Sequence, residues 1–268
     1  MSDTGTQTQM EHAPGSFCWI ELATTDGPGA KKFYGELFGW EAQDNPVGPD
    51  MVYTMLRLDS KDVGALYQKG EAMKEIPTFW MSYISVTNAD EIAAKAKSLG
   101  GTIVKEPFDV MDVGRMAVIT DPTGGTFAIW QPKTHKGVGV KGEPNSLTWN
   151  ELLTNDTAKA AEFYSKLFGW VPKTHGEPMP YTEFMTGDTH AGGMMQICPE
   201  MGPVPPHWGI YFAVNDTDAA FKKATSLGAQ AVVPPMDIEK VGRFATIRDP
   251  QGAVFSIIKF MPRHEENK

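Results

Sequence analysis

The spacing of apolar and polar positions changes early in the chain. Residues 17–22, FCWIEL, form a short alternating stretch rich in β-formers, which predicts a strand. In residues 27–40 the apolar positions follow one face of a helix, and they are Ala30, Phe33, Tyr34, Leu37 and Phe38. Asp26 can cap the free N–H groups at the start of this helix, and Gly39 is typical of a residue that ends one.

The same order of elements continues to the middle of the chain. Short strands are predicted around 52–58 and 63–68, and a further strand at 79–86. A second helix is predicted at 89–99, with Asn88 as its cap. The last predicted strands lie near 102–105, 114–120 and 125–131, and the sequence DPTGG supplies a tight turn between the final two. The pattern predicts two β-α-β-β-β modules.

The second half of the chain repeats the first. CWIELATTD at 18–26 returns as TWNELLTND at 148–156, an offset of 130. Beyond the loop after Trp40 the offset is 128, so VGRMAVITDPTGGTFAI at 113–129 matches VGRFATIRDPQGAVFSI at 241–257. The chain is therefore a duplication, and it contains four modules.

The duplication predicts two homologous domains, at residues 15–132 and 146–262. Residues 133–145 between them are rich in Gly and Lys, which is typical of a linker. Residues 1–14 are polar and acidic, without the basic start and apolar stretch of a secretory signal. We expect disordered tails at 1–14 and at 263–268.

Composition narrows the function classes. The chain has 268 residues, of which 41% are hydrophobic and 10% aromatic, which is enough to build two cores. No apolar run approaches the roughly 20 residues that span a bilayer. A net charge of −9 without a dense basic patch argues against nucleic acid or a membrane as partner. We expect a cytoplasmic monomer or homodimer whose partner is a small molecule.

Several common site motifs are missing from the sequence. Cys18 and Cys198 lie in different halves and form no CxxC pair, which predicts reduced, buried thiols. No GxGxxG or P-loop spacing follows a predicted strand, so nucleotide cofactors have no support. The sequence also shows no Ser elbow or Cys–His pair of a covalent nucleophile.

Three features together resemble the vicinal oxygen chelate superfamily. They are the order of the elements, the helix that contains FY and ends in LFGW, and the sequence VGRxAxxxDP before the final hairpin. That superfamily includes glyoxalase I, bleomycin-resistance proteins and extradiol dioxygenases. The resemblance covers roughly residues 16–132 and 146–261. It implies an α+β fold in which each pair of modules closes into a cupped mixed sheet around a ligand cavity, giving two cups in this chain.

The resemblance also implies four metal-ligand positions in each cup. In the first domain these fall on Trp19, Leu66–Gln68, Met81 and Ala128, and in the second on Trp149, Met194–Gln196, Gly209 and Ser256. Trp, Met, Ala and Gly cannot coordinate the cation, so we expect no metal ligands and no cofactor. A register slip in the second domain leaves one alternative, a divalent metal held by Glu151, Gln196, His190 and His207.

Two repeated charged residues admit two interpretations. Glu21 and Glu151 share the strand face of Trp19 and Trp149, so each is a candidate general base with a pKa raised by apolar walls. The structural alternative is a buried pair of these glutamates with the repeated Arg115 and Arg243, or a carboxylate that binds backbone N–H groups.

Aromatic residues recur in the predicted strands of both halves, and flat rings with one donor suit aromatic or cationic ligands. The candidate ligand-binding residues are Trp19, Tyr53, Trp80, Tyr83, Trp149, Tyr181, Trp208 and Tyr211, together with Met195. The alternative is that these side chains fill the cores and the seam between the domains. Trp40 and Trp170, at helix ends, are expected to pack as core.

The sequence therefore favours a glyoxalase/bleomycin-resistance-like protein that binds a small aromatic or apolar compound without a metal. One alternative is a metal-dependent glyoxalase-type lyase, isomerase or dioxygenase. Another is a metal-free enzyme that uses Glu21 or Glu151 as its general base. The use of both cups, or of one, stays open at this point.

Overall fold

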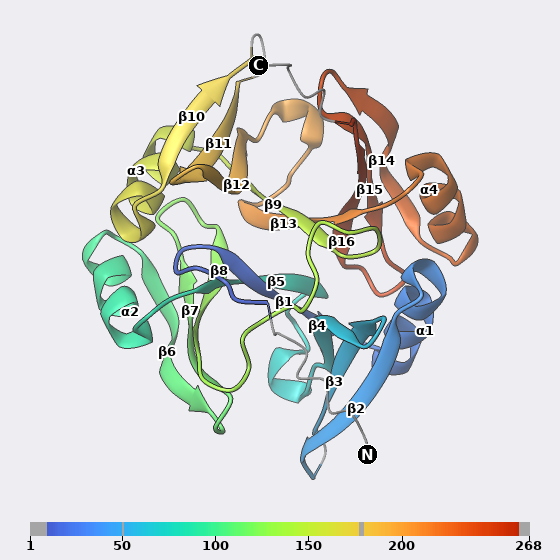
Figure 1. Ribbon diagram of the computed structural model, residues 1–268, viewed down its shortest axis with the longest axis horizontal. Helices are drawn as coiled ribbons and strands as arrows, with labels where there is room; N and C mark the ends of the chain where they lie inside the picture. The colour runs from blue at the N-terminus through green and yellow to red at the C-terminus, as the bar shows by residue number, and fades with distance from the viewer. Residues whose placement is uncertain (1–9, 50, 177–179, 263–268) are drawn as a thin grey trace, which may run out of the picture.

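The computed structural model describes residues 10–49, 51–176 and 180–262, and it contains two curved sheets joined by one connecting segment (Figure 1). The elements of the first domain are β1 (Phe17–Thr24), α1 (Gly27–Phe38), β2 (Glu41–Gly48), β3 (Met51–Leu58), β4 (Lys61–Gln68), β5 (Phe79–Ser85), α2 (Ala89–Ser98), β6 (Thr102–Val110), β7 (Gly114–Thr120) and β8 (Thr126–Pro132). Those of the second are β9 (Leu147–Thr154), α3 (Thr157–Phe168), β10 (Val171–His175), β11 (Tyr181–Thr186), β12 (Thr189–Gln196), β13 (His207–Ala213), α4 (Thr217–Ser226), β14 (Gln230–Ile238), β15 (Gly242–Arg248) and β16 (Val254–Phe260).

Each sheet is mixed and contains eight strands. The order is β2-β3-β4-β1-β5-β8-β7-β6 in the first and β10-β11-β12-β9-β13-β16-β15-β14 in the second. The two modules of a domain meet where β1 pairs antiparallel with β5, and β1 and β5 each also pair with a parallel neighbour. The predicted α+β class and the tandem pairs of β-α-β-β-β modules are confirmed.

The helices form where the sequence predicts them. Asp26 caps α1 by accepting a hydrogen bond from the N–H of Gly29, and Gly39 ends the helix in the left-handed conformation at φ 76°. Asn88 caps α2 in the same way. No helix of the described residues is long and apolar enough to cross a membrane.

Two edge strands are absent from the predicted elements. β2 and β10 lie at the outer edge of their sheets, and almost all of their side chains are exposed. Because neither face of these strands is buried, their sequences EAQDNPVG and VPKTH show no alternation that would predict a strand.

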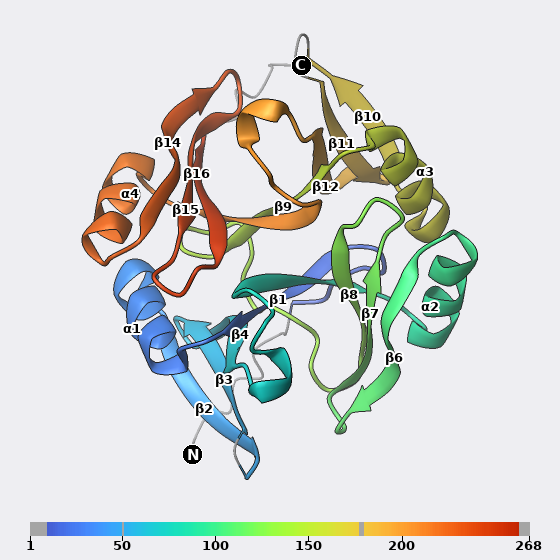
Figure 2. The same cartoon turned by 180° about the vertical axis from the view of Figure 1, so that it is seen from behind.

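The two domains share their cores in a reciprocal way. Helix α1 lies against α4, and α2 lies against α3 (Figure 2). The Tyr34 hydroxyl donates to Asp249 Oδ2 of the other domain at 2.8 Å, and the Tyr164 hydroxyl donates to Asp121 Oδ2 at 2.7 Å. Trp40 and Trp170 are buried in these shared cores, as predicted.

The connecting segment 133–145 packs on the first domain. The Val138 N–H donates to Cys18 O, and the Val138 side chain is fully buried. Of the predicted N-terminal tail, residues 10–14 are described, and His12 Nε2 lies 3.0 Å from Val138 O. Residues 1–9 of that tail and the predicted tail 263–268 lie outside the described residues.

Candidate functional site

A half-buried glutamate anchors a hydrogen-bonded cluster on the inner face of the first sheet. Glu21 on β1 accepts from the Tyr53 hydroxyl at 2.6 Å and from the Tyr83 hydroxyl at 3.0 Å. Trp19 Nε1 donates to the Tyr53 oxygen at 3.2 Å. We call the face of each sheet that carries these side chains its inner face.

The second sheet repeats this cluster. Glu151 accepts from the Tyr181 hydroxyl at 2.9 Å and from the Tyr211 hydroxyl at 2.8 Å. Trp149 Nε1 donates to the Tyr181 oxygen at 2.8 Å. The strand registers explain the match, because Trp149 pairs with Tyr211 as Trp19 pairs with Tyr83, so both side chains of each pair lie on one face.

Burial dominates the electrostatics of both clusters. It raises the pKa of Glu21 and of Glu151, while the hydroxyl groups that donate to each carboxylate oppose that rise. Burial and the neighbouring carboxylate also raise the pKa of the tyrosines, so the hydroxyls stay protonated donors. Each cluster therefore holds a carboxyl group on the inner face, between two tyrosines whose hydroxyls donate hydrogen bonds to it.

The structural alternative of a glutamate–arginine pair is wrong. Arg115 instead forms ion pairs with Asp90 and Asp109 at the outside of the first domain. Arg243 pairs with Asp218 and Asp237 in the same way. Each arginine links the start of a helix to a hairpin, β6–β7 in the first domain and β14–β15 in the second. The same surface ion-pair network therefore occurs in both halves of the repeat.

Trp80 and Trp208 need a correction, because the structure places them away from the clusters. Trp80 Nε1 donates to the Tyr34 hydroxyl, and Trp208 Nε1 donates to the Tyr164 hydroxyl, so both side chains lie in the shared cores. Trp80 and Tyr83 are three residues apart on β5 and point to opposite faces. Met195, in contrast, pairs with Tyr181 and shares the inner face with Gly193.

The positions that the family resemblance assigns to metal ligands do not fit a metal. Trp19, Met81 and Ala128 carry no suitable donor, and Trp149 and Gly209 carry none in the second sheet. No group of three or more His, Cys, Asp or Glu side chains that could hold a metal ion occurs in residues 10–49, 51–176 and 180–262.

The alternative ligand set of the second sheet is also dispersed. Both Glu151 oxygens accept from tyrosines, Gln196 Nε2 donates to Asn155 O, and His207 Nδ1 lies 2.8 Å from Pro205 O. His190 faces Glu183 instead, with His190 Nδ1 3.5 Å from the Glu183 carboxylate. These side chains do not converge on one point.

The cysteines behave as thiols without a partner cysteine. Both are free; Cys18 is buried, and Cys198 is only half-buried. The prediction of reduced thiols agrees with this arrangement, while the prediction that both are buried holds for Cys18 alone.

The connecting segment covers part of the first inner face, at Trp19. Trp19 packs edge-on against the His135 ring of the connecting segment at 4.4 Å between ring centroids, and Trp130 Nε1 donates to His135 O. Val138 joins the same apolar cluster, together with Ala65 and Ala128. His135 and Val138 were not candidate residues, because a Gly- and Lys-rich segment predicts a linker.

Sequence reasoning also missed a polar residue of the second inner face. Glu183 lies on β11, two positions from Tyr181 and therefore on the same face. The offset of 128 pairs it with Met55, so the signal was a charged residue at a position where the first copy is apolar.

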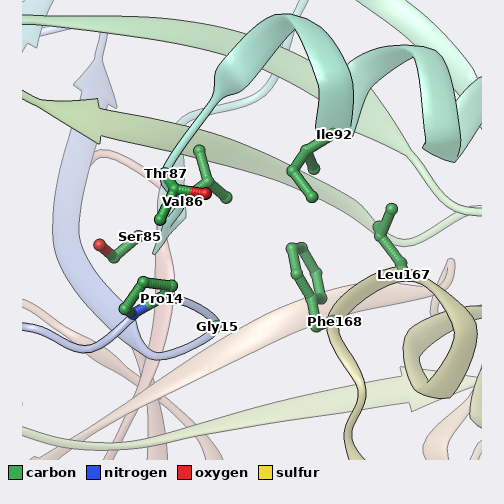
Figure 3. Close-up of a pocket in the computed structure, with 8 residues that line it drawn as sticks. All are labelled: Pro14, Gly15, Ser85, Val86, Thr87, Ile92, Leu167 and Phe168. Carbon is green, nitrogen blue, oxygen red and sulfur yellow. The ribbon is translucent and has the colours of Figure 1, made fainter.

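A small cavity of about 110 Å³ lies at the seam between the domains (Figure 3). Ile92 from α2 and Leu167 and Phe168 from α3 face it, with backbone of residues 14–15 at its edge. It contains no ionisable side chain and lies apart from both glutamate clusters, so it adds no candidate chemistry.

Comparison with protein families gives one match over both domains. The model described as the Glyoxalase/Bleomycin resistance protein/Dioxygenase superfamily matches residues 16–129 and 146–257. The chain is 41% identical to "Putative glyoxylase CFP32" of Mycobacterium tuberculosis over 94% of this chain and 98% of that protein. It is 34% identical to "Anthracycline biosynthesis protein DnrV" of Streptomyces peucetius, over 92% and 94% of the two chains.

Solved structures agree in fold. The Mn(II)-bound glyoxalase from Novosphingobium aromaticivorans superposes with a TM-score of 0.64 at 14% identity, over 92% of this chain and 82% of that chain. The 2,3-dioxygenase LapB from Pseudomonas sp. KL28 gives 0.65 at 11% identity, over 97% of both chains. At such low identity these similarities concern the fold alone.

Proposed function

Because the chain belongs to the glyoxalase/bleomycin resistance protein/dioxygenase superfamily, we propose that it binds a small aromatic or apolar compound on an inner face without a metal. One observation carries this proposal. The position of the first-strand metal ligand holds a tryptophan in both domains, and Trp19 and Trp149 each donate to a tyrosine of the glutamate cluster.

The chemistry of the second cluster suits such a ligand. The rings of Trp149 and Tyr181 offer flat apolar surface, and Met195 beside them adapts to irregular shapes. The Glu151 carboxyl group and its tyrosine hydroxyls offer hydrogen bonds to a polar substituent. The names of the two relatives, one in anthracycline biosynthesis and one as a glyoxylase, are consistent with work on a small molecule.

A titration with 2-naphthol tests the proposal. We expect isothermal titration calorimetry to show saturable binding by untagged protein, with the same affinity before and after treatment with a chelator. Metal content measured by plasma mass spectrometry after incubation with divalent ions is expected to stay far below one ion per chain. Binding that needs an added ion, or about one tightly held ion per chain, would contradict the metal-free site.

A second candidate function is metal-free catalysis with Glu151 as general base. The observation that favours it is the raised pKa of this buried carboxyl group, which brings proton transfer closer to neutral pH. Glu151 would accept a proton from the bound compound, and the Tyr181 and Tyr211 hydroxyls, which donate to the Glu151 carboxylate, would turn to donate to the electron pair left on that compound once Glu151 is protonated.

The variant Glu151→Gln separates the two functions. It keeps the size of the side chain and removes the base, so an enzyme loses turnover while the folded state and ligand binding persist. Tyr211→Phe is the companion variant, since it removes one donor and leaves the base in place. Turnover that survives Glu151→Gln would rule out the general-base mechanism.

A further inference from the structure

The two inner faces differ at equivalent positions of the repeat. Met55, Met81, Val118 and Ala128 of the first sheet correspond to Glu183, Gly209, Thr246 and Ser256 of the second. All four positions lie on the inner face, since Gly209 pairs with Glu151, and Ser256 pairs with Tyr211 and Thr246. The second inner face is therefore more polar at three of these positions, and at the fourth it has no side chain.

The difference changes access to the aromatic rings. Trp19 is 3% exposed, because His135 and Val138 of the connecting segment pack beside it. Trp149 is half-buried, and the ring beside it is that of His190, at 5.9 Å between ring centroids, against 4.4 Å between Trp19 and His135. A Cβ atom added at Gly209 would make only ordinary van der Waals contacts, the nearest with Glu151 O at 3.7 Å, so a side chain fits where this glycine has none.

Glu183 places a negative charge beside this accessible ring surface. Its side chain is 32% exposed, and its ion-pair partners among the described residues are His190 at 3.5 Å and His175 at 4.0 Å. An imidazole offsets the charge of a carboxylate only when it is protonated. The His190 ring in turn lies 5.9 Å from Trp149, so the carboxylate and the indole face border one region.

A carboxylate next to exposed aromatic faces is the arrangement that recognises organic cations. We propose that the inner face of the second sheet binds an aromatic compound carrying a cationic group, with Glu183 as the residue that selects the charge. This inference rests on the proposed function and specifies its ligand. Met55 gives the first sheet no such group, and the connecting segment packs on Trp19 of its inner face.

A pair of matched probes tests the charge preference. 2-Naphthylmethylammonium and 2-naphthylmethanol have the same ring, and only the first carries a positive charge. At pH 8 we expect calorimetry on the full chain to show about tenfold tighter binding of the ammonium probe, with one molecule bound per chain. Glu183→Gln should remove this preference and leave the affinity for the alcohol within about twofold of its original value.

Matched variants locate the site and control for charge. Glu239→Gln removes an equally negative side chain that is almost fully exposed, so the preference should persist in it. Gly209→Met places the residue of the first sheet into the second and should weaken both probes, whereas Met81→Gly should weaken neither. Glu183→Met, which copies Met55, is a second variant that should abolish the preference.

The outcomes separate this inference from the function on which it rests. Equal affinity for the two probes, or a preference that survives both Glu183 variants, overturns the charge selection while the proposed function stands. Weakening by Met81→Gly but not by Gly209→Met overturns the choice of the second sheet. Wild-type protein that binds neither probe overturns this inference, and failure with 2-naphthol as well overturns the proposed function.

Discussion

Gly193 shows how one residue sets the geometry of a cluster. A Cβ atom added there would lie within 3 Å of the Tyr181 hydroxyl and of Trp149 Nε1. Its counterpart in the first sheet is Ala65, and there the indole nitrogen stands 3.2 Å from the tyrosine oxygen, against 2.8 Å in the second sheet. Tyr181 occupies the space that a Cβ atom of residue 193 would fill, whereas beside Ala65 the equivalent Tyr53 lies between Trp19 and Glu21 with a longer indole contact.

We therefore predict that Gly193→Ala disrupts the second cluster. The added methyl group must displace Tyr181, so we expect a loss of about 1–3 kcal/mol in the free energy of unfolding, together with weaker 2-naphthol binding. Urea denaturation and calorimetry measure the two effects. Ala65→Gly is the matched control, and it should leave ligand binding unchanged. A Gly193→Ala protein with full stability and affinity would contradict this account.

Residue-level prediction from sequence succeeded where neighbours are local and failed where partners are distant. Strand parity alone could have separated Trp80 from Tyr83, since they are three residues apart on one strand. No pattern in the sequence shows that Arg115 finds Asp90, because that pair forms only when the start of α2 meets the β6–β7 hairpin, in which Arg115 lies opposite Asp109. The cluster partners of Glu21 were among the candidates, but their mutual hydrogen bonds were not predicted.

At the scale of elements, the connecting segment does more than join the domains. Its Gly and Lys content predicts a linker, yet residues 135 and 138 pack into the first inner face. Burial lowers the pKa of His135 and of His12, the second histidine that contacts this segment. Packing of the connecting segment therefore favours the neutral form of the His135 and His12 imidazoles.

This docking predicts an acid-sensitive contribution to stability. Both histidines have a folded-state pKa below the ordinary 6.5, so the unfolded chain binds more protons as the pH falls through that range. The contribution is fully present above about pH 6.5 and is lost at lower pH. We expect the free energy of unfolding in urea to fall from pH 7.5 to pH 5.5.

The double variant His12→Gln, His135→Gln isolates this effect. Glu21 and Glu151 have raised pKa values and change stability in the opposite direction with pH, but they are common to both proteins and cancel in the difference. The variant should show a smaller loss between the two pH values than the original chain. An equal loss in both proteins would rule out the two histidines as its source.

The edge strands mark the limit of element-level prediction. Buried strands such as β1 can be predicted from their apolar side chains. The internal repeat then predicts the same order of strands in both domains. β2 and β10 are held by backbone hydrogen bonds to a single neighbouring strand, so their side chains are free to be polar. The alternation of apolar and polar residues predicts a strand only where one face is buried, and the side chains of these two strands are almost all exposed.

At the scale of the whole molecule, reciprocal contacts unite the domains. Each tyrosine of an FY pair donates to the aspartate of the DPxG turn in the other domain, and a tryptophan donates to the same hydroxyl. Separate domains would leave Oδ2 of each buried aspartate without its tyrosine donor, while Oδ1 keeps the donors of its own turn, and the loss of a donor to a buried carboxylate is costly.

We predict that Tyr34→Phe lowers the free energy of unfolding by about 1–3 kcal/mol, because Asp249 loses a donor and Trp80 loses an acceptor. Tyr164→Phe should cost a similar amount through Asp121. Urea denaturation of both variants measures the effect. Tyr67→Phe, at a half-buried tyrosine outside the seam, is the control; a cost as large as those of the seam variants would contradict the role of these bonds.

The reciprocal contacts between the domains bear on how the chain evolved. Because each domain carries both a tyrosine donor and an aspartate acceptor, two copies of either half have the chemical groups to reproduce the seam between themselves. The chain thus resembles a homodimer whose subunits were fused by gene duplication and then diverged. The polypeptide that joins the two halves now packs against Trp19 of the first inner face, so the duplication has produced two inner faces with different surroundings.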